Sequence, residues 1–524
     1  MRLKKIIFVV IVILFLFGGI THGQDLQIYL DKTKLPTDWS LKNIIKIPEK
    51  DLSKFSKKLG GEIERLDNYY LKAGDLILQI NVLECPTEKE AKKIYNKFLN
   101  IKNSKLYCQR KNNIVIEYIC KNKYIIKKVR DLNLVQKSKL GTPTINKFLK
   151  NNHTQINLNK KDKFSLIDKE VAKNEIFFTA EYHGISINSK LELEFLKYFK
   201  DKADIKYHLL ELPYSMAELL NLYLETGNEK ILKKVIINAK GTYGGTQEEY
   251  KYWKQVYKFN KSLPDGEKIK LVGIDIEHQI TTSLWYLNTI LPDKKQPPAT
   301  IANDISKIKE MHQNIYFYSK EDINKLFIGL KENIFKNKND YETYLGDEIF
   351  DFKLICENVL TRFEAYNNRD SMKFNNIRDK QMYENFKKIY SHLPRGKYYG
   401  QWGMNHTYQR SQNGVNWVAS LMDNKDDSPV QGKILSIIYF YKDCMQMQKG
   451  KNNPKKINTY SSVIDLEKFA ISDLTLFKLI GENSPFSEKI YWLRNSSGGV
   501  TSDYFQYIIL IKNSEASSVF HDNS

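Results

Sequence analysis

The chain has 524 residues, of which 42% are hydrophobic and 12% are aromatic. This length accommodates two or three domains, and the apolar content is sufficient for a large core, so the composition excludes intrinsically disordered and collagen-like proteins. The only long apolar run lies at the N-terminus, which excludes a protein that crosses a membrane several times.

The formal net charge of +21 comes from lysine rather than arginine. Arginine supplies 10 of the 82 basic residues, and lysine supplies the other 72. Proteins that bind nucleic acids favour arginine, because its planar guanidinium group pairs with phosphate and with guanine. The basic residues are also interleaved with acidic ones along the chain. We therefore expect a solvated, lysine-rich surface and no nucleic-acid partner.

The N-terminal segment has the three parts of a signal peptide. Three basic residues lie within the first five positions, Ile6–Phe17 is an apolar stretch, and small residues precede Gln24. An uncleaved anchor helix is the alternative, but the apolar stretch is shorter than the roughly 20 residues that a membrane span needs. We expect Met1–Gly23 to be removed, which leaves a secreted or periplasmic protein without a membrane span.

Residues 24–136 are expected to form a small α+β module, and a ferredoxin-like arrangement is one candidate for its fold. Asp75–Leu83 alternates as a strand does, and Thr87–Leu99 has helical periodicity. A polar turn at residues 110–113 separates two apolar runs, which is typical of a β-hairpin. Residues 137–164 are rich in Asn and Lys and predict a linker.

Residues 165–524 are expected to form an α/β domain with a mostly parallel sheet. Short apolar strands alternate with amphipathic helices here, and this alternation is typical of parallel sheets. A long helical insertion is expected over about Thr300–Tyr390, where Pro and Gly are scarce. The expected strands lie at Glu175–Ala180, Tyr207–Leu210, Ile269–Ile274, Lys397–Trp402, Ile434–Tyr441 and Tyr504–Ile511.

Ionisable residues follow four of the expected strands. Glu181 and His183 follow the first strand and Glu211 the second. Asp275 follows the third strand and His406 the fourth. Ligands of open parallel sheets bind beyond the carboxyl ends of the strands, so we expect these side chains to converge on one site. Each of them, taken alone, is also compatible with a helix cap or a turn residue.

The helical insertion is expected to add a cation to this site. Arg378, Met382 and Asn385 share one helix face, because they are four and three positions apart. A buried arginine needs a partner, and the acidic strand ends can supply one. We expect Asp275, Asn385 and Tyr182 to contribute to binding at the same site.

The chain lacks the motifs of several common enzyme classes. It has no GxSxG, HExxH, Walker or GxGxxG motif, which disfavours serine-dependent α/β-hydrolases and dinucleotide-binding enzymes. Carboxylates, histidines and an arginine can instead activate water, because histidine accepts its proton and cations stabilise an oxyanion. The same groups could hold a divalent metal, and the ligands would then be Glu181, His183, Glu211 and His406.

Six segments of the chain, taken in order, resemble the erythromycin-esterase-like family: Glu181–Gly184, Glu211, Asn221–Gly227, Gly273–Asp275, Arg378–Asn385 and Gly403–His406. This family belongs to a superfamily that also contains haem-binding ChaN-type lipoproteins and the TraB/Tiki proteins. The resemblance covers about Ser165–Ile511 and leaves out the first module. It implies an α/β core with a helical insertion over a deep cleft.

The resemblance implies hydrolysis of an ester or lactone by a histidine-activated water, with no covalent serine and no required cofactor. Carried over, His183 is the general base and Glu181 is its partner. Glu211 helps to place the water, and Arg378 and His406 face the developing charge. The partner implied by this activity is a small-molecule substrate.

Two departures from the esterase pattern keep other functions of the superfamily open. One residue separates Glu181 from His183 where the esterases usually have two, and Gly403 stands where they tend to have a histidine. The first alternative is a ChaN-type protein that binds haem or another small ligand in the cleft. The second is a Tiki-like peptidase that depends on a divalent metal. The sequence leaves the oligomeric state open.

We predict that the mature protein begins near Gln24 and lies outside the cytoplasm, because the basic start, the apolar stretch and the small residues before Gln24 form a cleavable signal. N-terminal sequencing of the protein from separated cell fractions checks this prediction. Soluble cytosolic protein that still begins at Met1 would contradict it.

Overall fold

The computed structural model describes residues 28–30, 34–36, 39–102, 104–137, 145–369, 371–449, 451–459, 464–493 and 495–522. The chain divides into two compact units, one of residues 1–144 with 497–499 and the other of residues 145–496 with 500–524. Each unit has hydrophobic clusters of its own. The expected signal peptide, Met1–Gly23, lies outside the described residues.

The first unit contains a five-stranded antiparallel sheet in the order β2-β3-β4-β6-β5 and a separate β1-β7 pair. The expected strand, helix and hairpin are present as β4, α3 and β5-β6. A ferredoxin-like sheet contains the parallel pair of a split βαβ unit, and that arrangement is not found because every neighbouring pair here is antiparallel. The elements are β1 (Ile28–Leu30), β2 (Trp39–Lys46), α2 (Glu49–Leu59), β3 (Arg65–Ala73), β4 (Leu76–Glu84), α3 (Glu88–Lys102), β5 (Cys108–Lys111), β6 (Ile114–Ile119), α4 (Lys123–Asp131) and β7 (Val135–Lys137).

The second unit is an α/β domain with an eight-stranded sheet in the order β11-β10-β12-β9-β13-β17-β16-β8. The strands from β11 to β17 are parallel, and β16 runs antiparallel to both of its neighbours. The structure thus confirms a mostly parallel α/β core preceded by a small α+β module. The strands are β8 (His153–Gln155), β9 (Ile176–Glu181), β10 (Ile205–Pro213), β11 (Lys270–Asp275), β12 (Lys397–Gly403), β13 (Ile434–Lys442), β16 (Leu474–Lys478) and β17 (Tyr507–Lys512).

Both faces of this sheet are buried, and successive residues of a strand point to opposite faces. On β13, Ile437 and Tyr439 belong to one hydrophobic cluster, whereas Ile438 and Phe440 belong to another. A strand that is covered on both faces must be apolar at consecutive positions, which explains the continuous apolar runs in the sequence.

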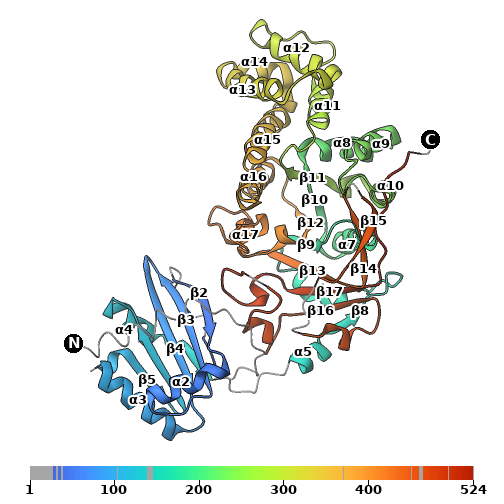
Figure 1. The fold of residues 1–524 in the computed structure, drawn as a ribbon. Helices are drawn as coiled ribbons and strands as arrows, with labels where there is room; N and C mark the ends of the chain where they lie inside the picture. The colour runs from blue at the N-terminus through green and yellow to red at the C-terminus, as the bar shows by residue number, and fades with distance from the viewer. Residues whose placement is uncertain are drawn as a thin grey trace. The chain divides into compact units, whose positions relative to one another are not determined.

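Helices form the expected insertion, which comprises α12 to α16. In Figure 1 the insertion extends away from the sheet beyond β11, with α12, α13 and α14 at its far end. No helix among the described residues is long and apolar enough to cross a membrane. The helices of this unit are α5 (Ile145–Asn151), α6 (Asp168–Val171), α7 (Ile187–Ala203), α8 (Tyr214–Thr226), α9 (Glu229–Asn238), α10 (Gln247–Ser262), α11 (Ile280–Ile290), α12 (Ala299–Asn314), α13 (Lys320–Lys336), α14 (Lys338–Leu345), α15 (Ile349–Asn367), α16 (Ser371–His392) and α17 (Val418–Asn424).

Several short elements differ from the expectation. The segment expected as a linker, residues 137–164, contains α5 and also β8, which pairs with β16 at the edge of the main sheet. β14 (Cys444–Gln448) and β15 (Lys451–Ile457) form a hairpin of their own. Short polar strands carry little periodic signal, so composition alone does not identify them.

Gly400 allows β10 and β12 to pack closely. Trp402, two residues further along β12, donates from its indole Nε1 to the carbonyl oxygen of Leu209 on β10 at 2.8 Å. A Cβ on Gly400 would overlap that carbonyl oxygen and would lie 2.6 Å from Trp402 Nε1. Space, rather than an unusual backbone angle, therefore requires glycine at this position.

We predict that Gly400→Ala lowers the free energy of unfolding by about 1–3 kcal/mol, because it overpacks a filled core. Gly329→Ala is the matched control: Gly329 is exposed within α13, and an added Cβ would have no atom within 4 Å. Removing this helix glycine should raise the same free energy by up to about 1 kcal/mol. Urea unfolding followed by circular dichroism measures both variants, and equal stabilities would refute the packing argument.

Candidate active site

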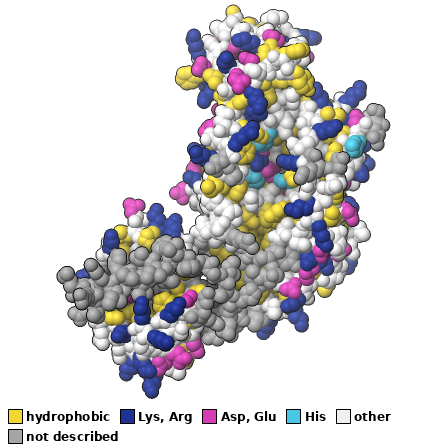
Figure 2. Space-filling view, in the orientation of Figure 1, with side chains coloured by type: hydrophobic (Ala, Val, Ile, Leu, Met, Phe, Trp, Pro, Cys, Tyr) yellow, Lys and Arg dark blue, Asp and Glu magenta, His cyan; other side chains and the backbone are white. Residues whose placement is uncertain are grey.

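The parallel register brings the expected site residues to one edge of the sheet. Glu181 at the end of β9 pairs with Gly403 at the end of β12, and Asp275 at the end of β11 pairs with Pro213 at the end of β10. Glu211 lies just before Pro213 on β10. Figure 2 shows histidine side chains with an acidic side chain between them in the middle of this unit. We call this edge the rim.

His183 is bonded to Glu181 and keeps its second ring nitrogen accessible. Its Nδ1 lies 2.6 Å from Glu181 Oε1, and its side chain is 37% exposed. The loop turns at Gly184, whose φ of +85° is a conformation that L side chains rarely adopt. The ring of Tyr243 stacks on the imidazole, with 5.4 Å between the centroids. Because Glu181 holds Nδ1, Nε2 is the nitrogen that is available for proton transfer.

Two distant segments fix the loop that carries His183. Gln446 of β14 donates from Nε2 to the carbonyl oxygen of His183 at 2.8 Å. The carbonyl oxygen of Gly184 accepts from the backbone N–H groups of Met447 and Ser517, at 2.8 and 3.0 Å. The position of the histidine is therefore set by the hairpin and by the C-terminal segment as well as by β9.

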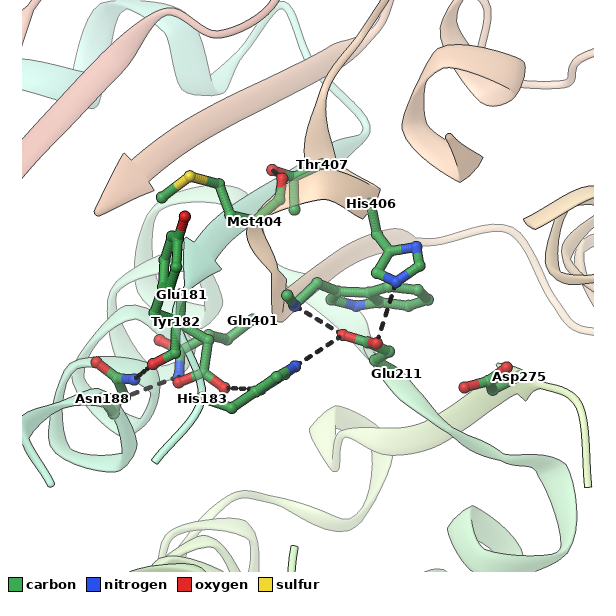
Figure 3. A network of polar contacts seen from close by, with 12 residues as sticks. Glu181, Tyr182, His183, Asn188, Glu211, Asp275, Gln401, Met404, His406 and Thr407 are labelled. Atoms are coloured by element: carbon green, nitrogen blue, oxygen red, sulfur yellow. Dashed lines mark hydrogen bonds and ion pairs between the residues drawn. The ribbon is translucent and has the colours of Figure 1, made fainter. Parts of the chain in front are cut away.

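Glu211 connects the two histidines of the rim. Its Oε2 accepts from the backbone N–H of Gly403 at 2.6 Å and lies 3.9 Å from His183 Nε2. Its Oε1 accepts from Arg378 Nη2 at 2.8 Å and lies 3.3 Å from His406 Nε2. Figure 3 shows Glu211 between the two imidazole rings. One carboxylate thus contacts three of the other four residues expected to be catalytic.

Arg378 on α16 is the expected cation, and it is fully paired. Its Nε lies 2.9 and 3.1 Å from the two carboxylate oxygens of Asp275, and its Nη2 contacts both Asp275 and Glu211. The side chain of Arg378 is 14% exposed and that of Asp275 is 1% exposed. Bidentate pairing compensates for the removal of these charges from water.

His406 lies in the short 3₁₀ turn Met404–Thr407 after β12 and is paired with Asp379. Its Nδ1 is 2.7 Å from Asp379 Oδ1, and its Nε2 is 3.1 Å from Arg378 Nη1. Asp379 Oδ1 also accepts from the backbone N–H of Val418 at 2.8 Å. The sequence interpretation does not single out Asp379, although its position directly after Arg378 is a usable signal.

Gly403 provides the space in which His183 approaches Glu211. A Cβ at this position would lie 2.9 Å from His183 Nε2 and 3.1 Å from Glu211 Oε2. Any side chain here would displace the ring from the carboxylate. The glycine that replaces the second histidine of the esterase pattern is thus part of this geometry.

The carboxylates around His183 favour its protonated form. Burial works to lower the pKa of the imidazole, but the hydrogen bond and charge of Glu181 and the charge of Glu211 outweigh it and raise the pKa to about 9. The ring is therefore an imidazolium at neutral pH, and its neutral form becomes abundant only as the pH approaches 9.

The other half of the rim is held in a charged state. Burial opposes ionisation of Glu211, but His406, Arg378 and His183 lower its pKa to about 2. Arg378 likewise holds the pKa of Asp275 far below its usual range, against the effect of burial. Asp379 and Glu211 raise the pKa of His406 although burial lowers it. At neutral pH Glu211 and Asp275 are therefore ionised and face the guanidinium of Arg378.

A buried polar network lies behind Glu181, and the sequence does not predict it. Gln401 Nε2 lies 3.4 Å from Glu181 Oε2 and 3.5 Å from Glu192 Oε2. Glu192 Oε1 is 3.2 Å from Nε2 of the fully buried His208. Burial raises the pKa of Glu192 and of Glu249, and it lowers that of His208 to about 4. Glu192 lies on the apolar face of α7, and that placement is the sequence signal for it.

Two residues expected to contribute to binding have other contacts. Asn385 is fully buried and donates to the carbonyl oxygen of Ile274 and to Asn358, so it attaches α16 to β11. The backbone N–H of Tyr182 donates to the hydroxyl of Tyr441, while the Tyr182 side chain is largely exposed. Asn385 thus connects α16 to β11 inside the domain, and Tyr182 lies between the paired residues Glu181 and His183 in the chain.

The described residues contain no group of three or more His, Cys, Asp or Glu side chains arranged to hold a metal ion. Apart from the accessible His183 Nε2, the atoms proposed as metal ligands at the rim contact protein groups. Glu181 contacts His183 Nδ1, and Gly403 and Arg378 donate to the two oxygens of Glu211.

We predict that His183 titrates with a pKa near 9 and that Glu181→Gln moves this pKa towards 6.5, because it removes the carboxylate charge. Since the folded-state pKa is raised, the stabilisation from protonated His183 is complete below about pH 6.5 and is lost as the pH rises through about 9. NMR titration of the imidazole signals measures both variants.

His208 is the internal control for this titration. Burial lowers its pKa to about 4, so its signal should not shift where that of His183 does. A parent pKa of His183 below 6.5 would show that burial outweighs the two carboxylates and would contradict the prediction.

No protein-family profile and no curated protein matches the sequence. Among solved structures, the chain matches a Bacillus cereus protein at 16% identity with a TM-score of 0.52, over 73% of this chain and 100% of that chain. It matches a succinoglycan biosynthesis protein at 15% identity with a TM-score of 0.53, over 72% of this chain and 99% of that chain.

A mutant of an erythromycin esterase in its open conformation also matches, at 12% identity with a TM-score of 0.49, over 69% of this chain and 98% of that chain. At these identities, the first two matches show that the chain shares their α/β fold.

Proposed function

We propose that the protein is a hydrolase that cleaves an ester or lactone with a water molecule activated by His183. The observation that carries this proposal is the pairing of His183 with Glu181 at 2.6 Å, with Nε2 directed towards Glu211 across a distance of 3.9 Å. A histidine oriented by a carboxylate at an accessible position is the arrangement that general-base catalysis requires.

In the first step, neutral His183 accepts a proton from water at Nε2, and the water oxygen attacks the carbonyl carbon. The carbonyl π electrons move to oxygen, which gives a tetrahedral oxyanion. Collapse of this intermediate breaks the bond to the leaving oxygen, which takes the proton back from the imidazolium. The products are a carboxylic acid and an alcohol, or one hydroxy acid from a lactone.

The charges around the rim suit this sequence of proton transfers. Glu181 stabilises the imidazolium that forms on His183, which makes the ring a strong base. Glu211 stays ionised and can orient the water near Nε2. Arg378 lies beyond Glu211, beside His406, and supplies the positive charge that offsets the developing oxyanion.

We predict that His183→Ala lowers kcat/KM for 4-nitrophenyl esters and small lactones by about 10²–10⁴-fold, the usual contribution of a general base. Above about pH 9, where protonated His183 no longer adds stability, the melting temperature should change little, because the side chain is partly exposed on a loop. His312→Ala is the matched control, since His312 is a partly exposed histidine of α12 in the insertion. It should leave both quantities unchanged.

The parent pH profile separates two roles for His183. If neutral His183 is the base, kcat/KM rises with pH to a plateau above about 9. A rate that falls above pH 9 would assign the imidazolium the role of an acid. Full activity of His183→Ala would transfer the role of base to His406. Chelator-sensitive peptide cleavage, or a Soret band on haem titration without ester turnover, would favour the metal-dependent or the haem-binding alternative.

A further inference from the structure

Arg362 on α15 has no acidic partner in the part of the chain that the structure describes. Its Nε is buried and makes no hydrogen bond, and burial lowers the pKa of its guanidinium. Arginine remains charged at physiological pH even so. An unpaired charge that has lost part of its hydration destabilises the fold, which marks this position for a function outside the fold itself.

The helix geometry places Arg362 at the end of the buried face of α15. Ile355, Val359, Arg362 and Tyr366 share one face of α15, because they are three and four positions apart. Ile355 and Val359 are fully buried in the core, so the buried face of the helix continues into Arg362 and Tyr366. The guanidinium therefore lies where the packed core ends.

Tyr366 connects this position to the rim through two hydrogen bonds. Its hydroxyl is 3.1 Å from His278 Nδ1, and His278 Nε2 is 3.1 Å from Asp275 Oδ2. Asp275 is the carboxylate that holds Arg378. Arg362 lies over the Tyr366 ring at 4.8 Å, so it is one side chain away from this chain of contacts.

The guanidinium is also held in one orientation. It lies 4.8 Å from the centroids of both Phe363 and Tyr366, which restricts its rotation. A second polar atom without a partner, the buried Oε1 of Gln279, belongs to the residue next to His278. Arg362 Nε and Gln279 Oε1 thus lie next to the His278–Tyr366 pair, and neither atom has a hydrogen-bond partner within the described residues.

We propose that Arg362 binds an anionic oxygen group of the substrate, a carboxylate or a phosphate, while the ester bond lies at His183. This inference rests on the proposed function. The planar fork of arginine matches such groups with two parallel hydrogen bonds, and a fork that is already oriented loses little entropy on binding. The site thus selects acidic esters, and neutral esters lack the group that Arg362 anchors.

The first test compares 4-nitrophenyl half-esters of dicarboxylic acids of increasing acyl length with their neutral methyl esters, so that the acyl length that reaches from His183 to Arg362 is found. Arg362→Gln should lower kcat/KM for the anionic ester of that length by about 10- to 100-fold and leave the neutral ester within about twofold, whereas Arg362→Lys should keep part of the preference. Arg369→Gln is the matched control, because Arg369 is exposed just beyond α15 and carries the same charge. It should change neither rate.

The second test measures binding without turnover, by thermal shift with succinate and with inorganic phosphate on the parent and on Arg362→Gln. Stabilisation that needs Arg362 supports the anion site, and the stronger of the two probes identifies the group. Such binding without hydrolysis of either class of ester would overturn the hydrolase proposal alone. Hydrolysis of both classes with no effect of Arg362→Gln would overturn the anion site alone, as would equal losses in Arg362→Gln and Arg369→Gln.

Discussion

The positive charge of Arg378 is the constraint on which the rim depends. Glu211 and Asp275 end adjacent parallel strands, and both are largely removed from water. Two ionised carboxylates in such a place repel each other, and one would take up a proton without a cation between them. Arg378 removes this repulsion by contacting both, so α16 of the insertion and the edge of the sheet form one electrostatic unit.

The buried carboxyl groups of the domain fall into two classes that differ in their partners. Glu211 and Asp275 face Arg378, which lowers the pKa of both, whereas burial raises the pKa of Glu192 and Glu249 well above the usual range. Glu181 lies between the two classes and is bonded to His183. The imidazole therefore lies beside a carboxyl group of lowered pKa, with carboxyl groups of raised pKa behind Glu181. This separation lets one small region contain both proton acceptors and proton donors.

The residues of the rim could be predicted because each follows an apolar strand, and strand ends share one edge in a parallel sheet. Their pairing could not be predicted, since the order β11-β10-β12-β9 places strands distant in sequence side by side. Asn385 shows the limit of periodicity: it shares a helix face with Arg378, but seven positions further along, that face is inside the core. Gly403 and Gly400 are required by atoms on neighbouring strands, which no local pattern reveals.

The loop after β9 is completed by residues from the far end of the chain. Besides the contact of Ser517 with Gly184, the backbone N–H of Ser186 donates to the carbonyl oxygen of Glu515 at 2.9 Å. The sheet neighbours of β9, which are β12 and β13, and the residues that fix its loop thus all lie far later in the chain than β9 itself. The position of His183 therefore depends on residues 515–517, and the sheet pairs of β9 involve none of them.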